Sequence, residues 1–389
     1  MKSRPFFVVS LVVILLLTSV ALVSSARDDG KNKRDNGEDK IRVVAHTDKE
    51  VSDALANGCK VVREARGLKA LTCSQTVVSS LGLQEDIKVF AMDSNANKQI
   101  RADVVQSSGN NGQGRKVVIL DTGYDYNHPE LSSSYLGGKD FVNDDDDPFD
   151  GNGHGSHIAG IITADGIDPK AKGVAPAAGI ISGKVLSDSG AGYFSDVVAA
   201  IYWAVDGPDG TFGTGDDFGA DAISISLGTA PPYTYKGFCD GVLPSLTDAI
   251  KYAKDKGVLV VVASGNSGGA GASIPGCISY STTIGAVDSR NRIASFSGTG
   301  NSVDLTAPGV NIYSSWIGNS SYAILSGTSM STPMVSGVVA LIKLAHPSYT
   351  AAQVENALFK TAKDLGKKGK DTSYGWGRVD AYSAVSFVL

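Results

Sequence analysis

After residue 93, short runs of apolar residues alternate with longer segments in which apolar residues recur at helical spacing. The short runs have the length and composition of buried strands and cover residues 117–120, 180–186, 222–226 and 258–263. The helix-like segments cover residues 196–205, 245–256 and 330–344. Strands that alternate with helices form parallel sheets covered by helices on both faces. We therefore predict an α/β fold with a mostly parallel sheet, in which functional side chains lie at the carboxyl ends of the strands.

The N-terminus has the pattern of a secretory signal peptide. Two basic residues precede an apolar run over residues 6–23, and the small residues Ser24-Ser25-Ala26 follow. We predict a signal peptide over residues 1–26, cleaved after Ala26, and hence a secreted, extracellular protein. Because the apolar run is long for a signal peptide, a retained membrane anchor is the alternative.

Charge and composition narrow the class of protein and its partners. The formal net charge of the 389 residues is −5, and all of the acidic excess lies after residue 92. An acidic body argues against nucleic acid as a partner. With 42% hydrophobic residues the chain can bury a large core, whereas the mixed charges of residues 27–40 indicate a solvated linker.

Four cysteines in a secreted chain favour disulfides, although four cysteines allow three pairings. Residues 60–64 and 68–72 flank a turn, so a hairpin here sets Cys59 opposite Cys73. We predict that Cys59 pairs with Cys73 and, by elimination, that Cys239 pairs with Cys277. Free buried thiols are the alternative.

The first motif that carries chemistry is Leu120-Asp121-Thr122-Gly123. Asp121 directly follows four apolar residues, so it is held at a strand end where its carboxylate can orient a neighbouring imidazole. An aspartic protease would need two such carboxylates sharing a proton, and the sequence contains no second Asp-Thr-Gly.

The second motif surrounds His154. Glycines on both sides of His154 let other backbone approach closely, and the spacing of Ile158, Ile161 and Ile162 indicates that a helix begins here. His154 and His157 could suggest a zinc site, but no glutamate lies between them in the metalloprotease pattern. We interpret His157 and the three remaining histidines as structural.

The third motif is Gly327-Thr328-Ser329-Met330-Ser331-Thr332-Pro333, which leads into an apolar helix. At the start of a buried helix, Ser329 is close to free N–H groups and to the positive end of the helix dipole, which can stabilise an oxyanion. A serine alone at this position would simply cap the helix. Together with Asp121 and His154, Ser329 is predicted to be a nucleophile, with His154 as its general base and Asp121 fixing the imidazole tautomer.

With these three motifs the chain resembles the subtilisin family, the subtilases. The motifs match the family's signatures in the order Asp, His, Ser. The similarity covers residues 99–384, and the departures, Ser156 for threonine and Ser331 for alanine, remove no catalytic group. The resemblance implies a secreted serine endopeptidase that cleaves protein and peptide substrates with broad specificity through an acyl-enzyme. It also implies that no catalytic cofactor is needed.

The resemblance implies further site residues. Asn266, after a predicted strand, would donate to the oxyanion together with the N–H of Ser329; removing the corresponding donor from subtilisin itself lowers turnover about 10²–10³-fold. One segment would pair with extended substrate as an edge strand, and two would wall the pocket for the residue before the cut. These substrate-binding residues are Gly190, Ala191, Gly192, Ser226, Leu227, Gly228, Ala263, Ser264 and Gly265.

The N-terminal region resembles the inhibitory propeptide of the family. Residues 27–92 would form a small α+β domain, and the acidic pair Glu85-Asp86 precedes the expected self-cleavage after Met92. The predicted domains are the signal peptide, this propeptide and a peptidase domain over residues 93–389. Met92 in the pocket would imply tolerance of unbranched apolar side chains. The mature enzyme is expected to be a monomer, without membrane attachment, and inhibited by its own propeptide until processing is complete.

An acidic loop before His154 is a candidate calcium site. Asp140, Asn143, Asp145 and Asp147 can converge oxygen ligands on a structural calcium ion, and the loop resembles a calcium site of thermophilic family members. A solvated acidic loop is the alternative. The Asp-rich and Gly-rich segment 206–217 is a second, weaker candidate.

Two other classes of protein have to be weighed against a peptidase. A catalytically inactive subtilase could serve as a binding protein, but the complete set of Asp121, His154, Ser329 and Asn266 argues against it. An esterase of the α/β-hydrolase type would need Gly-x-Ser-x-Gly and the order Ser, Asp, His. Ser329 instead lies in Gly-x-Ser-x-Ser, after both partners.

Overall fold

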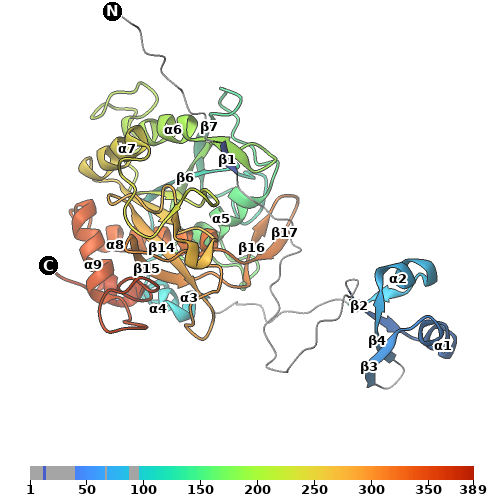
Figure 1. The fold of residues 1–389 in the computed structure, drawn as a ribbon. Helices are drawn as coiled ribbons and strands as arrows, with labels where there is room; N and C mark the ends of the chain where they lie inside the picture. Colours follow the sequence, from blue (N-terminus) through green and yellow to red (C-terminus); the bar gives the residue numbers. More distant parts are fainter. Residues whose placement is uncertain (1–11, 15–39, 66–67, 87–95) are drawn as a thin grey trace, which may run out of the picture. The chain divides into compact units, whose positions relative to one another are not determined.

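The computed structural model describes residues 12–14, 40–65, 68–86 and 96–389 (Figure 1). The chain divides into two units, residues 21–91 and the remainder, and each unit is described by itself. The predicted cleavage after Ala26, nearly all of the predicted linker and the processing bond after Met92 lie outside the described residues.

The smaller unit is an antiparallel sheet with two helices, in the strand order β3-β4-β2-β5. Its elements are β2 (Lys40–Ala45), α1 (Asp48–Ala56), β3 (Lys60–Ala65), β4 (Leu68–Ser74), α2 (Gln75–Leu81) and β5 (Gln84–Glu85). Thr47 and Glu50 form a capping box that starts α1. The predicted hairpin is confirmed as β3 and β4, and so is the disulfide between Cys59 and Cys73, whose Cα atoms lie 4.5 Å apart.

The larger unit is built on a seven-stranded sheet in which all neighbouring strands run parallel. The strand order is β15-β14-β12-β10-β6-β8-β7. The strands are β6 (Lys116–Asp121), β7 (Tyr135–Asp140), β8 (Gly179–Lys184), β10 (Ala222–Ile225), β12 (Leu259–Ala263), β14 (Thr282–Val287) and β15 (Val303–Pro308). The four strands predicted from apolar runs are therefore confirmed as β6, β8, β10 and β12.

Helices cover both faces of this sheet, as the sequence predicted (Figure 1). Val117 and Ile119 of β6 pack into one core with residues of α5 and α8, whereas Val118 and Leu120 pack into a second core with residues of α6 and α7. These helices are α5 (His154–Thr163), α6 (Phe194–Asp206), α7 (Pro244–Asp255) and α8 (Thr328–Ala345). By length and composition α8 could cross a membrane, but 83% of it is buried inside the fold, as in a core helix.

Shorter elements surround the sheet. The helices are α3 (Ala96–Gln99), α4 (Ala102–Ser107), the 3-10 helix η1 (Gly268–Ala270), α9 (Ala351–Thr361) and α10 (Ala381–Val385). The antiparallel pairs are β1 (Val12–Ile14) with β9 (Ala191–Tyr193), β11 (Thr234–Tyr235) with β13 (Ala272–Ser273), and β16 (Ile312–Trp316) with β17 (Ser321–Leu325).

The order of the strands determines where a site can form. The first strand of the large sheet, β6, lies between β8 and β10, so the chain order of the strands reverses beside it. In parallel sheets the crevice at the carboxyl ends of the strands opens at such a reversal. Asp121 is the last residue of β6.

Candidate active site

Asp121 and His154 form a direct hydrogen bond. His154 is the first residue of α5, and its Nδ1 lies 2.7 Å from Oδ1 of Asp121. The same oxygen accepts a 2.8 Å bond from the N–H of Thr122. Both side chains are buried, so the imidazole is oriented by a carboxylate that is itself held at a strand end. This geometry holds the proton on Nδ1 and leaves Nε2 of the neutral ring as an acceptor.

Two carboxylates determine the charge behaviour of His154. Burial disfavours the charged imidazolium, but the negative charges of Asp121 and Asp150 and the hydrogen bond to Asp121 outweigh it. The pKa of His154 is therefore raised above the ordinary histidine value. A cation that forms on this ring during a reaction is stabilised by both carboxylates.

Ser329 lies in the first turn of α8, at the carboxyl edge of the sheet. Its hydroxyl donates a 3.1 Å bond to the carbonyl of Ser226, the residue after β10, and Oγ of Ser226 donates a 3.0 Å bond to the carbonyl of Ser329. Among the described residues, the hydroxyl of Ser329 therefore bonds to backbone rather than to His154. A hydrogen bond between Ser329 and His154 would require the Ser329 side chain to rotate. Hydrogen bonds of this kind often form only when substrate binds.

Asn266 is anchored so that its amide donors are left available. Its Oδ1 accepts bonds of 3.0 Å from the N–H and 3.2 Å from the hydroxyl of Thr328, the residue before Ser329. Oγ1 of Thr328 in turn accepts a 3.1 Å bond from the N–H of Gly265. With its oxygen engaged, the Asn266 side chain presents its NH₂ group as the free end.

The two segments predicted to wall a pocket both reach the start of α8. Ser226 contacts Ser329, and Gly265 contacts Thr328. A side chain on Gly228 or Gly265 would collide with the hydroxyl of Ser273, which is buried and has no hydrogen-bond partner among the described residues. Glycine at these two positions is therefore required by close packing.

Of the other residues predicted to wall the pocket, Leu227 is buried in the core, and Ala263 and Ser264 are held by the sheet. The side chain of Leu227 packs in the core beneath α6 and α7, so only its backbone can face a substrate. Ala263 ends β12, and the N–H of Ser264 donates a 2.9 Å bond to the carbonyl of Ile284 in the next strand. These contacts fix the wall to the sheet.

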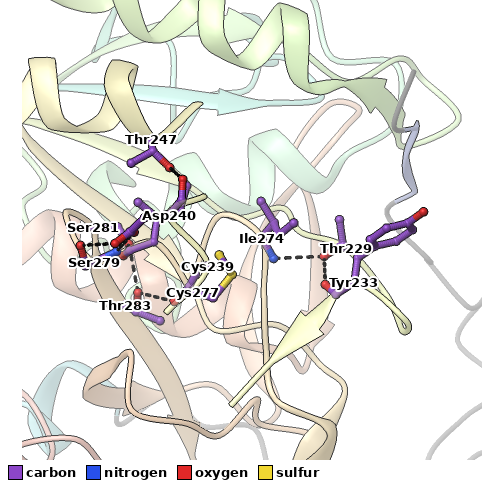
Figure 2. The surroundings of a disulfide bond; sticks show 12 residues. Thr229, Tyr233, Cys239, Asp240, Thr247, Ile274, Cys277, Ser279, Ser281 and Thr283 are labelled. Carbon is purple, nitrogen blue, oxygen red and sulfur yellow. Dashed lines mark hydrogen bonds between the residues drawn. A yellow bond between two sulfur atoms is a disulfide. The ribbon is translucent and has the colours of Figure 1, made fainter. Parts of the chain in front are cut away.

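The second disulfide joins the segment that follows β11 to the segment that follows β13 (Figure 2). Cys239 and Cys277 are joined as predicted, with Cα atoms 5.3 Å apart. Nearby, the N–H of Ile274 donates a 3.0 Å bond to Oγ1 of Thr229, and the Thr229 hydroxyl donates to the carbonyl of Tyr233. Segment 273–277 is thereby tied to the strand end that follows β10.

Ala191 and Gly192 of the predicted edge strand lie in β9, whereas Gly190 lies in the turn before it, where its N–H donates to the carbonyl of Ser187. The short strand β1 pairs with β9 antiparallel, with Val13 opposite Gly192 and Ile14 opposite Ala191. On the other side, the N–H of Ser187 donates a 2.8 Å bond to the carbonyl of Ala191. A side chain on Gly192 would lie 2.1 Å from the carbonyl oxygen of Val185, so only glycine fits there. The β9 edge can thus accept an extended segment through backbone hydrogen bonds.

The other buried histidines have structural contacts. His157 lies one turn into α5, and its Nε2 is 3.2 Å from the carbonyl of Ala323. Burial, assisted by His154, lowers the pKa of His157 to about 3, so this ring is neutral. Nε2 of His128 is 2.9 Å from the carbonyl of Ser321. Within the described ranges, no group of three or more His, Cys, Asp or Glu side chains could hold a metal ion.

The acidic loop does not bring its four predicted calcium ligands into one ligand set. Asp140 is buried, and its carboxylate accepts bonds from the amide of Val142 and from both the backbone and side chain of Asn143. Asp145 accepts from the amide of Asp147, which itself binds the Tyr126 hydroxyl. In this geometry the carboxylates of Asp140 and Asp145 accept hydrogen bonds from donors of the same loop. In segment 206–217, the carboxylates of Asp209, Asp216 and Asp217 likewise accept from donors of their own loop. Asp206 instead accepts from the hydroxyl of Tyr252 in α7.

Three residues that contact the site were not singled out from the sequence. Thr328 holds Asn266, Ser273 lies between the two pocket glycines, and Asp150 is buried at the start of α5. Thr328 lies within the Ser329 motif, and Asp150 lies four residues before His154. Their closeness in sequence to catalytic candidates could therefore have pointed to both. Ser273 has no local signal, because only the tertiary fold brings it against Gly228 and Gly265.

An oriented Asp–His pair and a serine at a helix start, at the carboxyl edge of a parallel sheet, are typical of serine hydrolases. The sequence profile of the Subtilase family matches residues 112–377. A thermophilic serine proteinase of Bacillus sp. (strain AK1) is 38% identical over 275 residues, which are 70% of this chain and 62% of that protein. The M-protease of Shouchella clausii (strain KSM-K16) is 38% identical over 78% of this chain and 73% of its own length. Subtilisin Savinase of Lederbergia lenta is 38% identical over 74% of this chain and 96% of its own length.

The chain therefore belongs to the subtilase family of serine endopeptidases. The resemblance inferred from the three motifs and the predicted α/β fold are both confirmed.

Proposed function

We propose that this protein hydrolyses peptide bonds through Asp121, His154 and Ser329. Oγ of Ser329 would attack the carbonyl carbon of the peptide while Nε2 of His154 takes its proton. The tetrahedral oxyanion would be held by the amide of Asn266 and the N–H of Ser329. The leaving amine would take the proton from His154, and a water molecule, activated in the same way, would release the acyl group.

The observation that carries this proposal is the 2.7 Å bond between His154 and Asp121. It supports a ring with its proton on Nδ1 and its lone pair on Nε2, which a general base for Ser329 needs. The anchoring of Asn266 by Thr328, next to Ser329, supports an oxyanion site assembled at the same helix start.

Substrate binding is proposed to follow the backbone. The β9 edge would pair with an extended peptide, while the segments 226–228 and 263–265 would enclose the side chain before the cut. Backbone pairing reads no side chains, which favours broad specificity towards protein and peptide substrates.

We also propose that the protein is exported as a precursor with residues 1–26 as signal peptide and 27–92 as inhibitory propeptide. The two disulfides support an oxidising, extracellular destination. The antiparallel α+β unit within residues 40–86 supports a separately folding N-terminal domain. The mature peptidase, residues 93–389, is proposed to act as a monomer without a catalytic cofactor.

The pH dependence of activity tests the role of His154. The base works only when neutral, and the pKa of His154 is raised, so activity should be lost as pH falls through a value above about 6.5 and should persist in mild alkali. The measurement is kcat/KM on a chromogenic peptide from mildly acidic to alkaline buffer. In parallel, a fluorophosphonate should label Ser329 and abolish activity in proportion. An optimum near pH 4, or full activity after complete labelling, would contradict the proposal.

Calcium binding at the loop 140–147 is a finer proposal that rests on its sequence pattern. An ion bound only by the folded state stabilises it, so a chelator is expected to lower the melting temperature by several degrees. The double variant Asp145→Ala/Asp147→Ala should lose this response, whereas Asp255→Ala, an exposed residue of α7, should keep it. Identical melting curves with and without chelator would rule out a stabilising site.

A further inference from the structure

A buried carboxylate outside the catalytic trio lies at the start of the helix that carries His154. Asp150 is 0% exposed, and its two oxygens accept five hydrogen bonds of 2.7–2.9 Å. The donors are the hydroxyl of Thr122, the N–H groups of Asn152, Gly153 and Ser156, and the hydroxyl of Ser156. All five bonds are donated to its oxygens, so both oxygens of Asp150 act as hydrogen-bond acceptors.

The first turn of α5 depends on these contacts. Its N-cap residue, Gly153, has no side chain that could cap the helix. The free N–H of Gly155 instead donates 2.9 Å to Oγ1 of Thr122, and that of Ser156 donates 2.8 Å to Oδ2 of Asp150. Free N–H groups at a helix start destabilise the helix when they have no acceptor. The acceptors on Thr122 and Asp150 therefore determine the residue at which α5 begins, and with it the position of His154.

Two hydroxyls connect Asp150 to the strand that ends in Asp121. Thr122 follows Asp121 directly, donates to Asp150 and accepts from the N–H of Gly155. Ser156 donates to Asp150 and accepts a 2.9 Å bond from the N–H of Asp125. Each hydroxyl has one donor and one acceptor role, so the network has a single satisfied arrangement. It holds the start of α5 against the end of β6, across which the bond between His154 and Asp121 is made.

Four titratable groups surround the His154 ring or its partner. Asp121 comes from β6, Asp150 from the loop before α5, His157 from α5, and Lys184 from β8. His157 is neutral, and the Lys184 ammonium is engaged by the carbonyl of Thr122 and by Asp188. Asp150 is thus the second negative charge that acts on the imidazole, and within the described part of the chain no Lys, Arg or His side chain forms an ion pair with it.

We propose that Asp150 is a positioning residue for His154, holding the start of α5 in register with Asp121 and supplying a fixed negative charge that stabilises the imidazolium formed during the reaction. This inference rests on the proposed function, because His154 must act as the general base. Among the described residues, the Asp150 carboxylate bonds to Thr122, Asn152, Gly153 and Ser156 and not to Ser329, so it would act through the orientation and charge of His154.

The test compares Asp150→Asn with Asp255→Asn, which removes a carboxylate that pairs with Lys251 on the surface of α7. Asp150→Asn is expected to lower kcat by about 10–100-fold with KM nearly unchanged, because a small misplacement of a catalytic group has effects of this size. The pH at which its activity falls on the acid side should be lower than in wild type, because a negative charge that raises the pKa of His154 is lost. Asp255→Asn should match wild type in both. Rates are expressed per Ser329 labelled by fluorophosphonate at completion, which counts folded enzyme. Wild-type kcat and an unchanged acid-side pH of activity loss in Asp150→Asn would overturn the proposal.

A second pair of variants covers the case in which Asp150→Asn does not fold. Thr122→Val removes the hydroxyl that joins Asp150 to β6, whereas Thr122→Ser keeps it. We expect kcat to fall at least about tenfold in the valine variant and to remain near wild type in the serine variant. Equal kcat in both would overturn the positioning role. A wild-type enzyme that neither cleaves peptide nor takes the label would instead overturn the proposed function, and the role of Asp150 with it.

Discussion

Ser329→Ala is expected to lose nearly all peptidase activity and to accumulate as an uncut precursor. In subtilisin itself, removal of the nucleophile lowers turnover about 2 × 10⁶-fold, and a loss of similar order is expected here. If the proposed propeptide is removed by the same active site, the variant cannot cut its own chain after Met92. The precursor should therefore begin near Arg27, remain folded and fail to react with a fluorophosphonate.

The measurement is the N-terminal sequence and mass of the purified variant, alongside its rate on a peptide substrate. The matched control is Ser331→Ala, two residues further along α8, whose hydroxyl donates to the carbonyl of Ala307 rather than facing the site. The control should be processed and active. If Ser329→Ala purified alone is still cut at Met92, another protease does the processing or Ser329 is not the nucleophile.

Asn266→Ala is expected to lower kcat about 10²–10³-fold with little change in KM, the loss seen when the corresponding donor is removed from subtilisin. The amide would bond strongly only to the oxyanion, so its loss raises the barrier more than it weakens substrate binding. Because the Asn266 oxygen also binds Thr328, the alanine variant disturbs one structural contact as well.

Asn266→Asp separates these two effects. A carboxylate can still accept from the N–H and hydroxyl of Thr328, but it has no N–H to donate. We expect this variant to melt near the wild-type temperature and to be at least as slow as Asn266→Ala. Asn127→Ala, at an exposed asparagine, should be unchanged in kcat. A wild-type kcat in both Asn266 variants would remove Asn266 from the oxyanion site.

The sequence predicted the strands best where burial is complete. The run 117–120 lies in β6, buried on both faces, because a parallel strand between two helical layers must be apolar along its whole length. Cys59 and Cys73 were also predictable, since a hairpin with a short turn places opposite residues at a known distance. Asp121, His154 and Ser329 could be named because each lies in a distinctive local motif.

The acidic loop marks the limit of this approach. Alternating oxygens in Asp140, Asn143, Asp145 and Asp147 are compatible with a cation, but the same oxygens can accept hydrogen bonds from the amides of their own loop. The local pattern is the same in both cases. Only the folded loop decides which donors reach the carboxylates.

The sequence alone predicted the type of fold and the family, and it named the residues proposed to carry the chemistry, because strand periodicity, helix starts and sequence motifs are local properties. Only the tertiary structure decided which residues far apart in the sequence contact one another. Asp150 becomes a partner of Thr122, Ser273 fills the space between Gly228 and Gly265, and Thr328 holds Asn266. Such contacts depend on which strands become neighbours in the sheet and on how closely their ends approach. No short stretch of sequence contains that information.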